Sequence, residues 1–497
     1  APSEPMTVAG RSGDLPGSRP RSAVSRYATR AAWTASTLVL ALITLSALRA
    51  SIEPIGAVLT DFPGPYGGIG LGVAGVYVLA GIGLISLARR AAVKDWIPGS
   101  GLPLAIVMLA ILVRVALAVV ADAPLVGENR IIHEQALGVM EGLCCFSHRP
   151  LGYPVALAGA YAVFGVGPSA IEILNICFAA LTAWLVWDIS RATWGRPVAA
   201  VAATTYAIIP SQVLMALVPL TEPMYTMLVA GAVRAGIALE RRPMLMAAVA
   251  CAGLLAASQY VRATAASLVA PIALLPWLVG WTWRRTVLRS ALIAVVFLVL
   301  LLPVVSFNLR AHGDLSISTS AYGGWSLYVG ANPEHGGAWN AEDAGRLAGF
   351  PGSSWWERSE YAGSLALDRV LQDPPASLQL LARKFDTLWG DERYAAEYAL
   401  SSGSVTRAPH SVWLASQLFW TPLVALATLG MLAGRRQPRP AALLIGMTVT
   451  VVAVSHLVLE VHGRYHAALV PLLCVLAAVG VEALATWWRA RGVAVNP

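Results

Sequence analysis

Residues 103–122 read PLAIVMLAILVRVALAVVAD, an apolar run in which Arg114 is the only charge before the final aspartate. At about 1.5 Å per residue such a run forms a helix of roughly 30 Å, the thickness of the hydrocarbon core of a bilayer. A charge inside the bilayer is costly, so Arg114, in the outer half of the helix, is expected to snorkel toward the membrane surface. The stretch therefore predicts a transmembrane helix.

Similar runs recur along the whole chain and decide its class. Apolar stretches of about 17 residues or more predict twelve membrane-spanning helices. They lie near residues 32–50, 68–88, 103–122, 170–189, 196–212, 218–239, 243–261, 264–281, 286–307, 411–433, 439–459 and 465–487. With 57% hydrophobic and 12% charged residues, the 497-residue chain is neither soluble nor disordered, and five cysteines are too few for a disulfide scaffold. The expected fold class is an all-α polytopic membrane protein.

Short basic clusters between the runs indicate the orientation. They lie at Arg89/Arg90/Lys94, Arg191/Arg196, Arg241/Arg242, Arg284/Arg285/Arg289, Arg435/Arg436/Arg439 and Arg489/Arg491. If the N-terminal tail is cytoplasmic and residues 153–167 lie on the outer surface or re-enter there, every cluster falls on the cytoplasmic side, as the positive-inside bias requires. Both termini are then cytoplasmic. The net charge of +8 reflects this topology. The basic residues form no continuous basic face, so nucleic-acid binding is not expected.

Two hydrophilic segments fall on the outer side under this topology and leave room for polar chemistry. Residues 122–150 hold Glu128 at the mouth of a span, where its carboxylate can serve as a base or be a solvated loop charge. Residues 308–410 are rich in aromatic side chains, which stack on sugar rings and also anchor at membrane interfaces. Amphipathic stretches at about 357–371 and 376–389 predict helices there, and we interpret this segment as a cap over the membrane face.

Several motifs follow one another in a fixed order from the first outer loop onward. They are Gly127-Glu128-Asn129, Arg149-Pro150-Leu151-Gly152-Tyr153-Pro154, Thr221-Glu222-Pro223, Arg262, Asn308-Leu309-Arg310, Gly323-Gly324-Trp325, Arg383-Lys384 and Gly463-Arg464-Tyr465. This ordered set resembles bacterial family 39 type glycosyltransferases of the GT-C superfamily, which includes the protein O-mannosyltransferases and the lipid A aminoarabinose transferase. The resemblance covers about residues 103–475 and implies a GT-C fold with an outer-surface helix after the first loop.

The resemblance and the topology together divide the chain into five parts. We expect a disordered cytoplasmic tail at 1–31, two extra transmembrane helices at 32–102, a seven-helix GT-C core at 103–307 with the outer loop 122–167, an extracytoplasmic cap at 308–410, and three transmembrane helices with a short cytoplasmic tail at 411–497.

The function that the resemblance implies is an inverting sugar transfer at the outer face of the cytoplasmic membrane of a bacterium. The donor would be a polyprenyl-phosphate-linked sugar, and the acceptor a glycan, lipid or protein of the cell envelope. Glu128 would be the general base for the acceptor hydroxyl. It stands where the relatives usually carry Asp, and the following Asn129 cannot act as a base. An excess of arginine over lysine favours a GC-rich genome, and mannose or arabinose as the sugar, but the sequence leaves both sugar and acceptor open.

Cations would stabilise the leaving phosphate, whose charge grows in the transition state. The candidates at the outer rim are Arg149, Arg310, Arg383, Lys384 and Arg464. Supporting roles are open to His133, Tyr153, Glu222, Arg262 and Tyr465. Each cation can equally be a surface or snorkelling charge, and helix capping alone would explain Glu222.

A metal site and two other functions remain as alternatives. Among His133, His148, His462 and His466, only the last two are four residues apart, and Arg464 between them disfavours a dication, so no metal cofactor is expected. A transporter or flippase of lipid-linked sugars usually has repeats and broken helices near the middle of the membrane, whereas the polar residues here gather at one face. A glycan ligase that uses a lipid diphosphate is the alternative among enzymes.

Overall fold

The computed structural model describes residues 23–54, 99–121, 123, 125–142, 149–241, 245–400, 410–435 and 438–491. Within these ranges the chain is helical and contains no strand. Six helices among them are long and apolar enough to cross a membrane, and the number rises to eight if each of two bent pairs is one span. The all-α polytopic class is therefore confirmed. The span expected near 68–88, residue His148 and the adjacent Cys144 and Cys145 lie outside the described residues.

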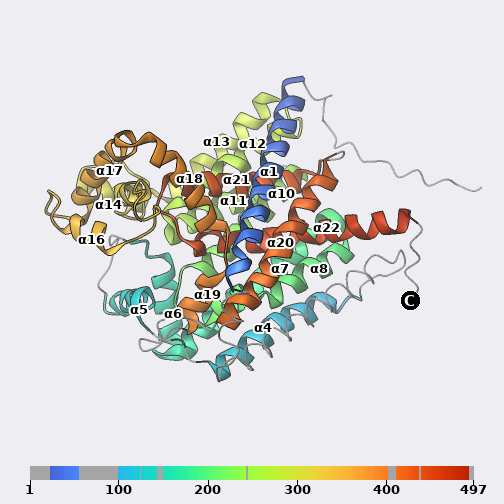
Figure 1. Cartoon of the computed structure of the whole chain (residues 1–497), viewed down its shortest axis with the longest axis horizontal. Helices are drawn as coiled ribbons and strands as arrows, with labels where there is room; N and C mark the ends of the chain where they lie inside the picture. Colours follow the sequence, from blue (N-terminus) through green and yellow to red (C-terminus); the bar gives the residue numbers. More distant parts are fainter. Residues whose placement is uncertain are drawn as a thin grey trace, which may run out of the picture.

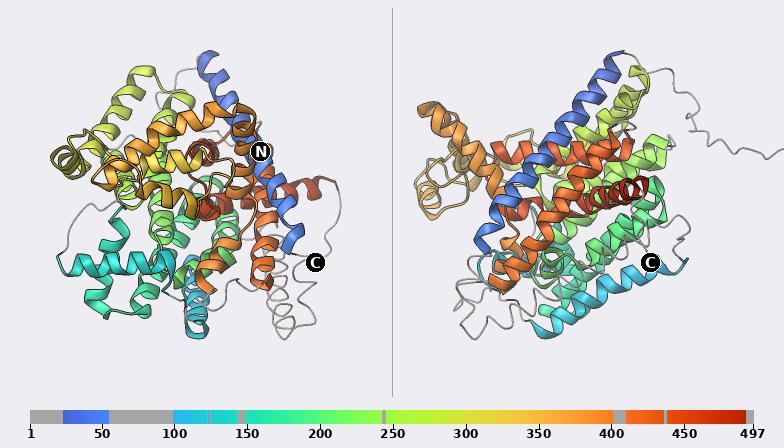
Figure 2. Two further views of the ribbon diagram at one scale, coloured as in Figure 1. Left: turned by 60° about the vertical axis from the view of Figure 1, so that its left-hand side comes forward. Right: turned by 45° about the vertical axis from the view of Figure 1, so that its right-hand side comes forward.

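The helices form a bundle with a smaller group at one end (Figures 1 and 2). The bundle consists of α1 (Ala23–Ala50), α4 (Leu102–Val120), α7 (Pro168–Trp194), α8 (Arg196–Ile208), α9 (Pro210–Leu214), α10 (Glu222–Arg241), α11 (Leu245–Val261), α12 (Val269–Leu278), α13 (Trp283–Leu300), α20 (His410–Gly434), α21 (Pro440–Val458) and α22 (Val470–Ala490), with the 3₁₀ turns η1 (Met215–Leu217), η2 (Ala263–Leu268) and η3 (Gly463–Leu469). The outer loop forms α5 (Gly127–Met140) and α6 (Gly152–Phe164). The smaller group is formed by α14 (Leu302–His312), α15 (Gly323–Gly330), α16 (Ala341–Ala348), α17 (Trp355–Gln372) and α18 (Pro374–Trp389) (Figure 1). Helix α19 (Arg393–Leu400) packs on the bundle against α9, η1, η3 and α20.

Two of the expected spans are broken by proline. The run 196–212 bends by 55° between α8 and α9, where Pro210 begins the second helix, and the run 286–307 bends by 54° between α13 and α14, next to Pro303. Proline lacks the amide hydrogen and clashes with the preceding turn, so a helix rarely continues straight through it.

Arg114 does not snorkel, contrary to the expectation from the sequence. Its side chain is fully buried and donates hydrogen bonds to the carbonyl oxygens of Ala110, Ala207 and Gln212, each at 2.9–3.2 Å. The last two carbonyls flank the break between α8 and α9, where backbone acceptors have lost helical partners. The buried guanidinium of Arg114 thus supplies hydrogen-bond donors to carbonyl groups at the break between α8 and α9.

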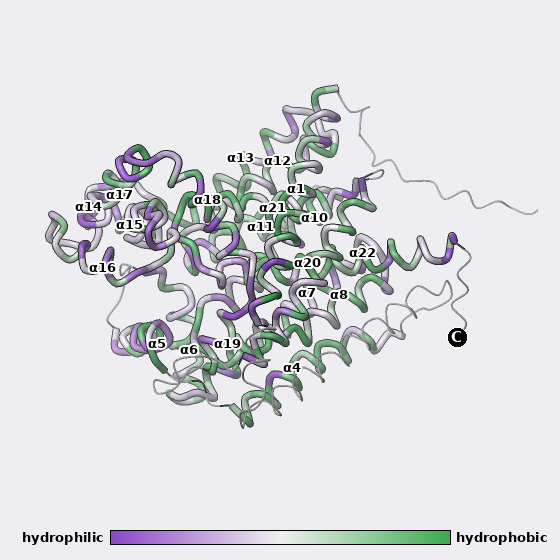
Figure 3. The backbone as a smooth tube through the Cα atoms, viewed as in Figure 1, coloured by the Kyte–Doolittle hydropathy of each residue, from purple (hydrophilic) through white to green (hydrophobic). Residues whose placement is uncertain are grey.

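The opposite face of α4 is apolar and exposed. Its exposed side chains recur at helical spacing and are Leu104, Met108, Leu112, Val115 and Val119. A stripe of this kind is unfavourable in water and is expected of a lipid-facing surface. Figure 3 shows that apolar residues dominate the bundle helices and that polar residues gather toward the smaller group of helices.

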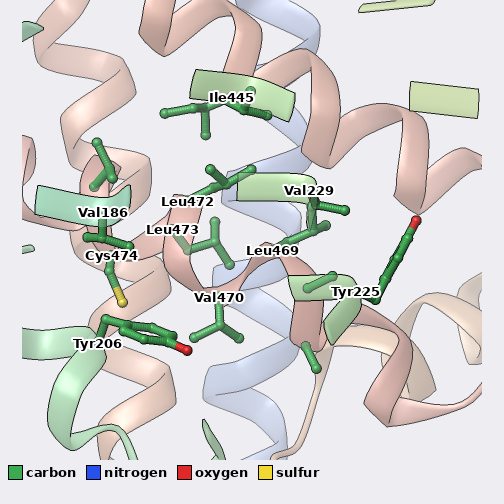
Figure 4. Packing of buried hydrophobic residues seen from close by; sticks show 14 of the residues in the cluster. Val186, Tyr206, Tyr225, Val229, Ile445, Leu469, Val470, Leu472, Leu473 and Cys474 are labelled. Carbon is green, nitrogen blue, oxygen red and sulfur yellow. The ribbon is translucent and has the colours of Figure 1, made fainter. Parts of the chain in front are cut away.

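The interior of the bundle is centred on α22. Figure 4 shows its residues Leu472, Leu473 and Cys474 packed among side chains of neighbouring helices, namely Val186 of α7, Tyr206 of α8, Val229 of α10 and Ile445 of α21. Cys474 is fully buried and fills the interior as a small apolar side chain.

The first helix begins earlier than expected, at Ala23 inside the tail predicted for 1–31. Ser25 and Thr29 are buried and donate hydrogen bonds to the carbonyl oxygens of Trp277 and Leu278 at the end of α12. Leu278 is the last residue of α12, where a carbonyl has no amide donor from a following helical turn, so the bond from Thr29 stabilises the first turns of α1.

The group of helices α14 to α18, which we call the cap, has a small core of its own. Trp325, Tyr328, Val329, Leu347 and Ala362 pack together there. The helices predicted near 357–371 and 376–389 are confirmed as α17 and α18. Figure 2 shows the cap at one end of the bundle in its right-hand view.

Helices α20 and α22 cross at a pair of glycines, Gly430 and Gly480. A Cβ on Gly430 would overlap the carbonyl oxygen of Leu476, and one on Gly480 would overlap that of Leu426. Small residues of this kind let two membrane helices approach closely.

We predict that Gly480→Ala lowers the free energy of unfolding by about 1–3 kcal/mol, because the added methyl group forces the two helices apart. Thermal unfolding of the purified protein in detergent measures the effect. Gly253→Ala is the matched control, since a Cβ there meets nothing within 4 Å and alanine has the higher helix propensity. Equal stabilities of the two variants would contradict the close crossing.

Candidate functional site

Charged side chains from five distant segments meet at the end of the bundle beside the cap. Glu128 lies in the first turn of α5, and Glu222 in the first turn of α10. Arg149 precedes α6, Arg262 links α11 to η2, and Arg464 lies in η3. We call these five residues the arginine–glutamate cluster.

The cluster is a continuous chain of ion pairs. Glu128 accepts from Arg149 Nη1 through Oε1 at 2.9 Å, and its Oε2 lies 2.5 Å from Arg464 Nη2. The Oε1 atom of Glu222 lies 3.4 Å from both Arg464 Nε and Arg262 Nη2. Arg464 is thus shared by both carboxylates, and it is the central cation.

Aromatic rings line the cations of this cluster. The guanidinium of Arg262 lies 4.6 Å from the ring centre of Tyr465, and that of Arg464 lies 5.0 Å from the ring centre of Tyr398. Arg149 lies 5.4 Å from the ring centre of Tyr322 in the cap. These cation–π contacts hold the guanidinium planes without neutralising their charge, so the cations stay electrostatically available.

The charge on Glu128 is fixed by its neighbours. Burial raises the pKa of its carboxyl, but the positive charges of Arg464 and Arg149 outweigh burial and hold the pKa at about 2. The group is ionised at any physiological pH and is a weak base in this state. It can take a proton efficiently only when something else binds the two arginines.

A further acid, Glu460, lies at the same site and was not among the residues predicted from the sequence. It belongs to the short link between α21 and η3, where its amide donates to the Ser326 carbonyl at 2.8 Å. Burial raises the pKa of its carboxyl to about 7, although Arg464 lowers it. Its carboxylate has no hydrogen bond or ion pair to any described residue. No local motif marks this acid, because its character comes from long-range burial next to Glu128 and Arg464.

Three of the predicted cations lie outside the cluster. Arg310 is exposed on α14 and has no ion pair within the described part of the chain. Arg383 is exposed and donates to the Pro333 carbonyl at 3.1 Å. Lys384 is buried and donates to the Gly330 carbonyl at 2.9 Å, and burial lowers its pKa to about 8, against the charge of Glu460. Arg383 and Lys384 therefore fasten α18 to the loop after α15.

The supporting residues separate in the same way. Glu222, Arg262 and Tyr465 belong to the cluster and its aromatic lining, so helix capping is not the whole role of Glu222. Tyr153 is fully buried and donates to Asn175 Oδ1 at 2.9 Å, which ties α6 to α7. His133 lies 2.7 Å from the Tyr161 hydroxyl and ties α5 to α6.

The histidines considered as metal ligands have different surroundings. His466 Nε2 lies 2.7 Å from Glu392 Oε1, and its ring stacks on Trp420 with ring centres 4.6 Å apart, so it belongs to the core. Burial and the charge of Arg464 lower the pKa of His462 to about 3. Within the described ranges, Glu334, His335 and Glu342 form the one group with ligand atoms close enough for a metal, and all three are exposed on the cap.

A narrow hollow opens beside the cluster, on the side of the bundle between α10, η2 and α21. Arg262 and Tyr465 line it together with Tyr225, Leu268 and Val452. Its wall combines apolar and aromatic side chains with polar ones, namely Arg262, His456, Thr264, Ser267 and Ser455.

The chain is similar to known structures but matches no protein-family model, and no curated protein matches its sequence. It is similar to ArnT from Cupriavidus metallidurans bound to undecaprenyl phosphate, with 14% identity and a TM-score of 0.39, over 78% of this chain and 79% of that one. It is also similar to the oligosaccharyltransferase AglB from Archaeoglobus fulgidus in complex with an inhibitory peptide and a dolichol-phosphate, with 12% identity and a TM-score of 0.48.

The apo form of the Archaeoglobus fulgidus oligosaccharyltransferase gives 13% identity and a TM-score of 0.49. This chain spans 52% of the length of that enzyme, and 80% of this chain is covered. All three TM-scores lie below 0.5, and we therefore infer function from the residues of the site.

The raised pKa of Glu460 leads to a prediction about stability. The folded protein holds this proton more tightly than the unfolded chain, whose carboxyl has the ordinary pKa of 4.5, so the contribution of Glu460 to stability falls as the pH rises from about 4.5 to about 7. Glu460→Gln removes this loss. The melting temperature of the variant relative to wild type is expected to rise between about pH 5 and about pH 8.

Thermal unfolding across this pH range measures the difference. Glu134→Gln is the control, because Glu134 is an exposed carboxylate on α5 paired with Arg130 at 2.7 Å and should show no such trend. A difference for Glu460→Gln that does not change with pH would contradict the buried environment of this acid.

Proposed function

We propose that this chain is a membrane glycosyltransferase of GT-C type that transfers a sugar from a polyprenyl-phosphate donor to an extracytoplasmic acceptor of the bacterial cell envelope. The observation that carries the proposal is the cluster of three arginines and two glutamates at the polar end of an apolar bundle. Arginine binds phosphate through its planar fork of donors, and a carboxylate beside it can take the proton of an acceptor hydroxyl. The ordered motifs of the sequence support the same assignment.

The formal charges of the cluster favour an anionic ligand. Arg149, Arg262 and Arg464 contribute three positive charges against Glu128 and Glu222, which leaves one positive charge in excess as long as Glu460, whose pKa is raised to about 7, is protonated. A polyprenyl phosphate combines a long apolar body with one charged end, so its tail would lie against the apolar outer surface of the bundle while its phosphate reaches the cluster. Among the cations predicted from the sequence, Arg149 and Arg464 are therefore the proposed phosphate-binding residues, and Arg262 is their supporting partner.

Transfer would proceed with inversion at the anomeric carbon. The acceptor oxygen forms the new bond to that carbon, its proton passes to Glu128, and the bond to the phosphate oxygen breaks with the electron pair leaving on the phosphate. Guanidinium groups stabilise the charge that grows there. A phosphate that binds Arg149 and Arg464 also draws them from Glu128, so the pKa of this carboxyl rises when the donor is present.

Broken helices are the observation that favours a transporter, because transporters bind substrates at such breaks. In this chain the break between α8 and α9 is filled by Arg114, which bonds to the freed carbonyls of Ala207 and Gln212. The break between α13 and α14 leads into the cap. The charges that could bind a substrate gather instead in the arginine–glutamate cluster at the end of the bundle, and the enzyme is the better-supported function.

We predict that Glu128→Gln still binds the lipid donor but loses transfer by about 10²- to 10⁴-fold, because an amide keeps the size of the side chain and cannot accept the proton. Glu128→Asp should retain measurable activity. Transfer from a radiolabelled polyprenyl-phosphate sugar to membrane acceptors measures the effect. Glu134→Gln on the same helix is the control and should turn over at the wild-type rate; wild-type turnover of Glu128→Gln would assign the base to another acid, with Glu460 the first to test.

We predict that Arg464→Gln loses about 2–4 kcal/mol of transition-state stabilisation and weakens donor binding more than acceptor binding. Arg383→Gln is the matched variant, because Arg383 is exposed and bonds to a backbone carbonyl of the cap. Its donor affinity should remain within about twofold of wild type. Equal losses in both variants would show that the phosphate lies nearer to α18 than to the cluster.

A further inference from the structure

A second hollow lies in the cap and is open to solvent on one side. The hollow is formed by the end of α14, the loop after it and the start of α17. Its lining includes Asn308, His312, Ser320, Trp355 and Trp356. Among the described residues no carboxylate, lysine or arginine lines it, so its chemistry differs from that of the arginine–glutamate cluster.

Aromatic rings form one side of this hollow. The rings of His312 and Trp356 are stacked with centres 4.6 Å apart and an angle of 4° between their planes. Trp355 is 43% exposed and packs against Tyr322 with ring centres 5.5 Å apart. Flat, partly exposed rings are the surfaces on which the C–H faces of sugar rings pack.

Two polar atoms that line the hollow have unused hydrogen-bonding capacity. The indole Nε1 of Trp356 is buried and has no hydrogen-bond partner among the described residues. Asn308 is buried and uses its amide hydrogens on the carbonyl oxygens of Ser316 and Ser318, while its Oδ1 accepts no hydrogen bond within the described ranges. A buried donor without a partner is costly unless a ligand satisfies it. One free donor and one free acceptor beside aromatic rings suit a neutral ligand with hydroxyl groups.

The hollow is connected to the cluster through a single ring. Tyr322 packs against Trp355 on one side and lies under the guanidinium of Arg149 on the other. Arg149 in turn binds Glu128 at 2.9 Å. A ligand seated against Trp355 would therefore lie next to Tyr322, the ring that contacts the arginine partner of Glu128.

We propose that this hollow in the cap is a saccharide subsite that binds a sugar ring of the acceptor, with Trp355 and Trp356 as stacking surfaces and Trp356 Nε1 and Asn308 Oδ1 as hydrogen-bonding groups. The identification of the saccharide as the acceptor rests on the proposed function, whereas the binding of a neutral sugar does not. The acceptor would accordingly be glycosylated, or would itself be a glycan.

Saturation-transfer NMR with the purified full chain in detergent tests the subsite without requiring transfer. The probes are the neutral methyl glycosides of mannose, glucose and arabinose. In wild type, the ring protons of at least one glycoside should receive saturation from the protein. Trp355→Ala and Trp356→Ala should weaken binding by about tenfold, as expected for the loss of an aromatic contact, and Trp356→Phe, which keeps the ring without the N–H, should give a smaller loss.

Two control variants test whether glycoside binding is specific to this hollow. Trp339→Ala removes a cap tryptophan that is 60% exposed and does not line the hollow, and it should bind the glycoside as wild type does. Arg464→Gln should also leave glycoside binding unchanged, so a failure of the proposed transfer chemistry remains distinguishable from a failure of the subsite. Absence of binding to all three glycosides in wild type, or unchanged binding in both tryptophan-to-alanine variants, would overturn the proposal and leave the rings as interface anchors.

Discussion

The burial of Arg464 is the constraint on which the polar end of the molecule depends. Its side chain is only 9% exposed, and an unpaired buried charge costs on the order of 3–5 kcal/mol. Glu128 and Glu222 supply the compensating charges from α5 and α10. Because the cation and its two partners come from three separate segments, satisfying this one guanidinium fixes the outer loop, the start of α10 and the chain after α21 relative to one another.

The two carboxylates of the cluster lie at helix N-termini, where the backbone favours negative charge. Glu128 and Glu222 both lie in the first turn of a helix, where the partial positive charge of the N-terminus stabilises a carboxylate. Arg262 and His462 have extended backbone immediately before the 3₁₀ turns η2 and η3. These two breaks turn the chain at the end of the bundle, so that Arg262 and Arg464 reach the same pair of acids.

The sequence predicts the all-α membrane class because lipid imposes composition on every span, although six to eight of the described helices qualify as spans against the twelve expected. Ordered motifs single out Glu128, Arg149 and Arg464, which the structure brings together. The sequence does not predict contacts between residues far apart in the chain. Arg114 lies in an apolar run like a snorkelling charge, and its real partners are carbonyls almost one hundred residues away in sequence at a break in another helix. Glu460 has no motif either, since its properties arise only when the cap and η3 close around it.

Two acids at one site with different basicity suggest how the proposed reaction would be divided between them. Without donor, the pKa of Glu128 is about 2 because the charges of Arg464 and Arg149 outweigh burial, and the pKa of Glu460 is about 7 because burial outweighs the charge of Arg464. A bound phosphate adds negative charge near Arg149 and Arg464, which raises both pKa values. Glu460 is then protonated near neutral pH, while Glu128 stays ionised and gains basicity. The negative charge of the donor phosphate therefore makes Glu128 the base of the site and keeps Glu460 as a neutral acid. Although Glu128 is the stronger acid without donor, it is the carboxylate that can accept a proton when donor is bound.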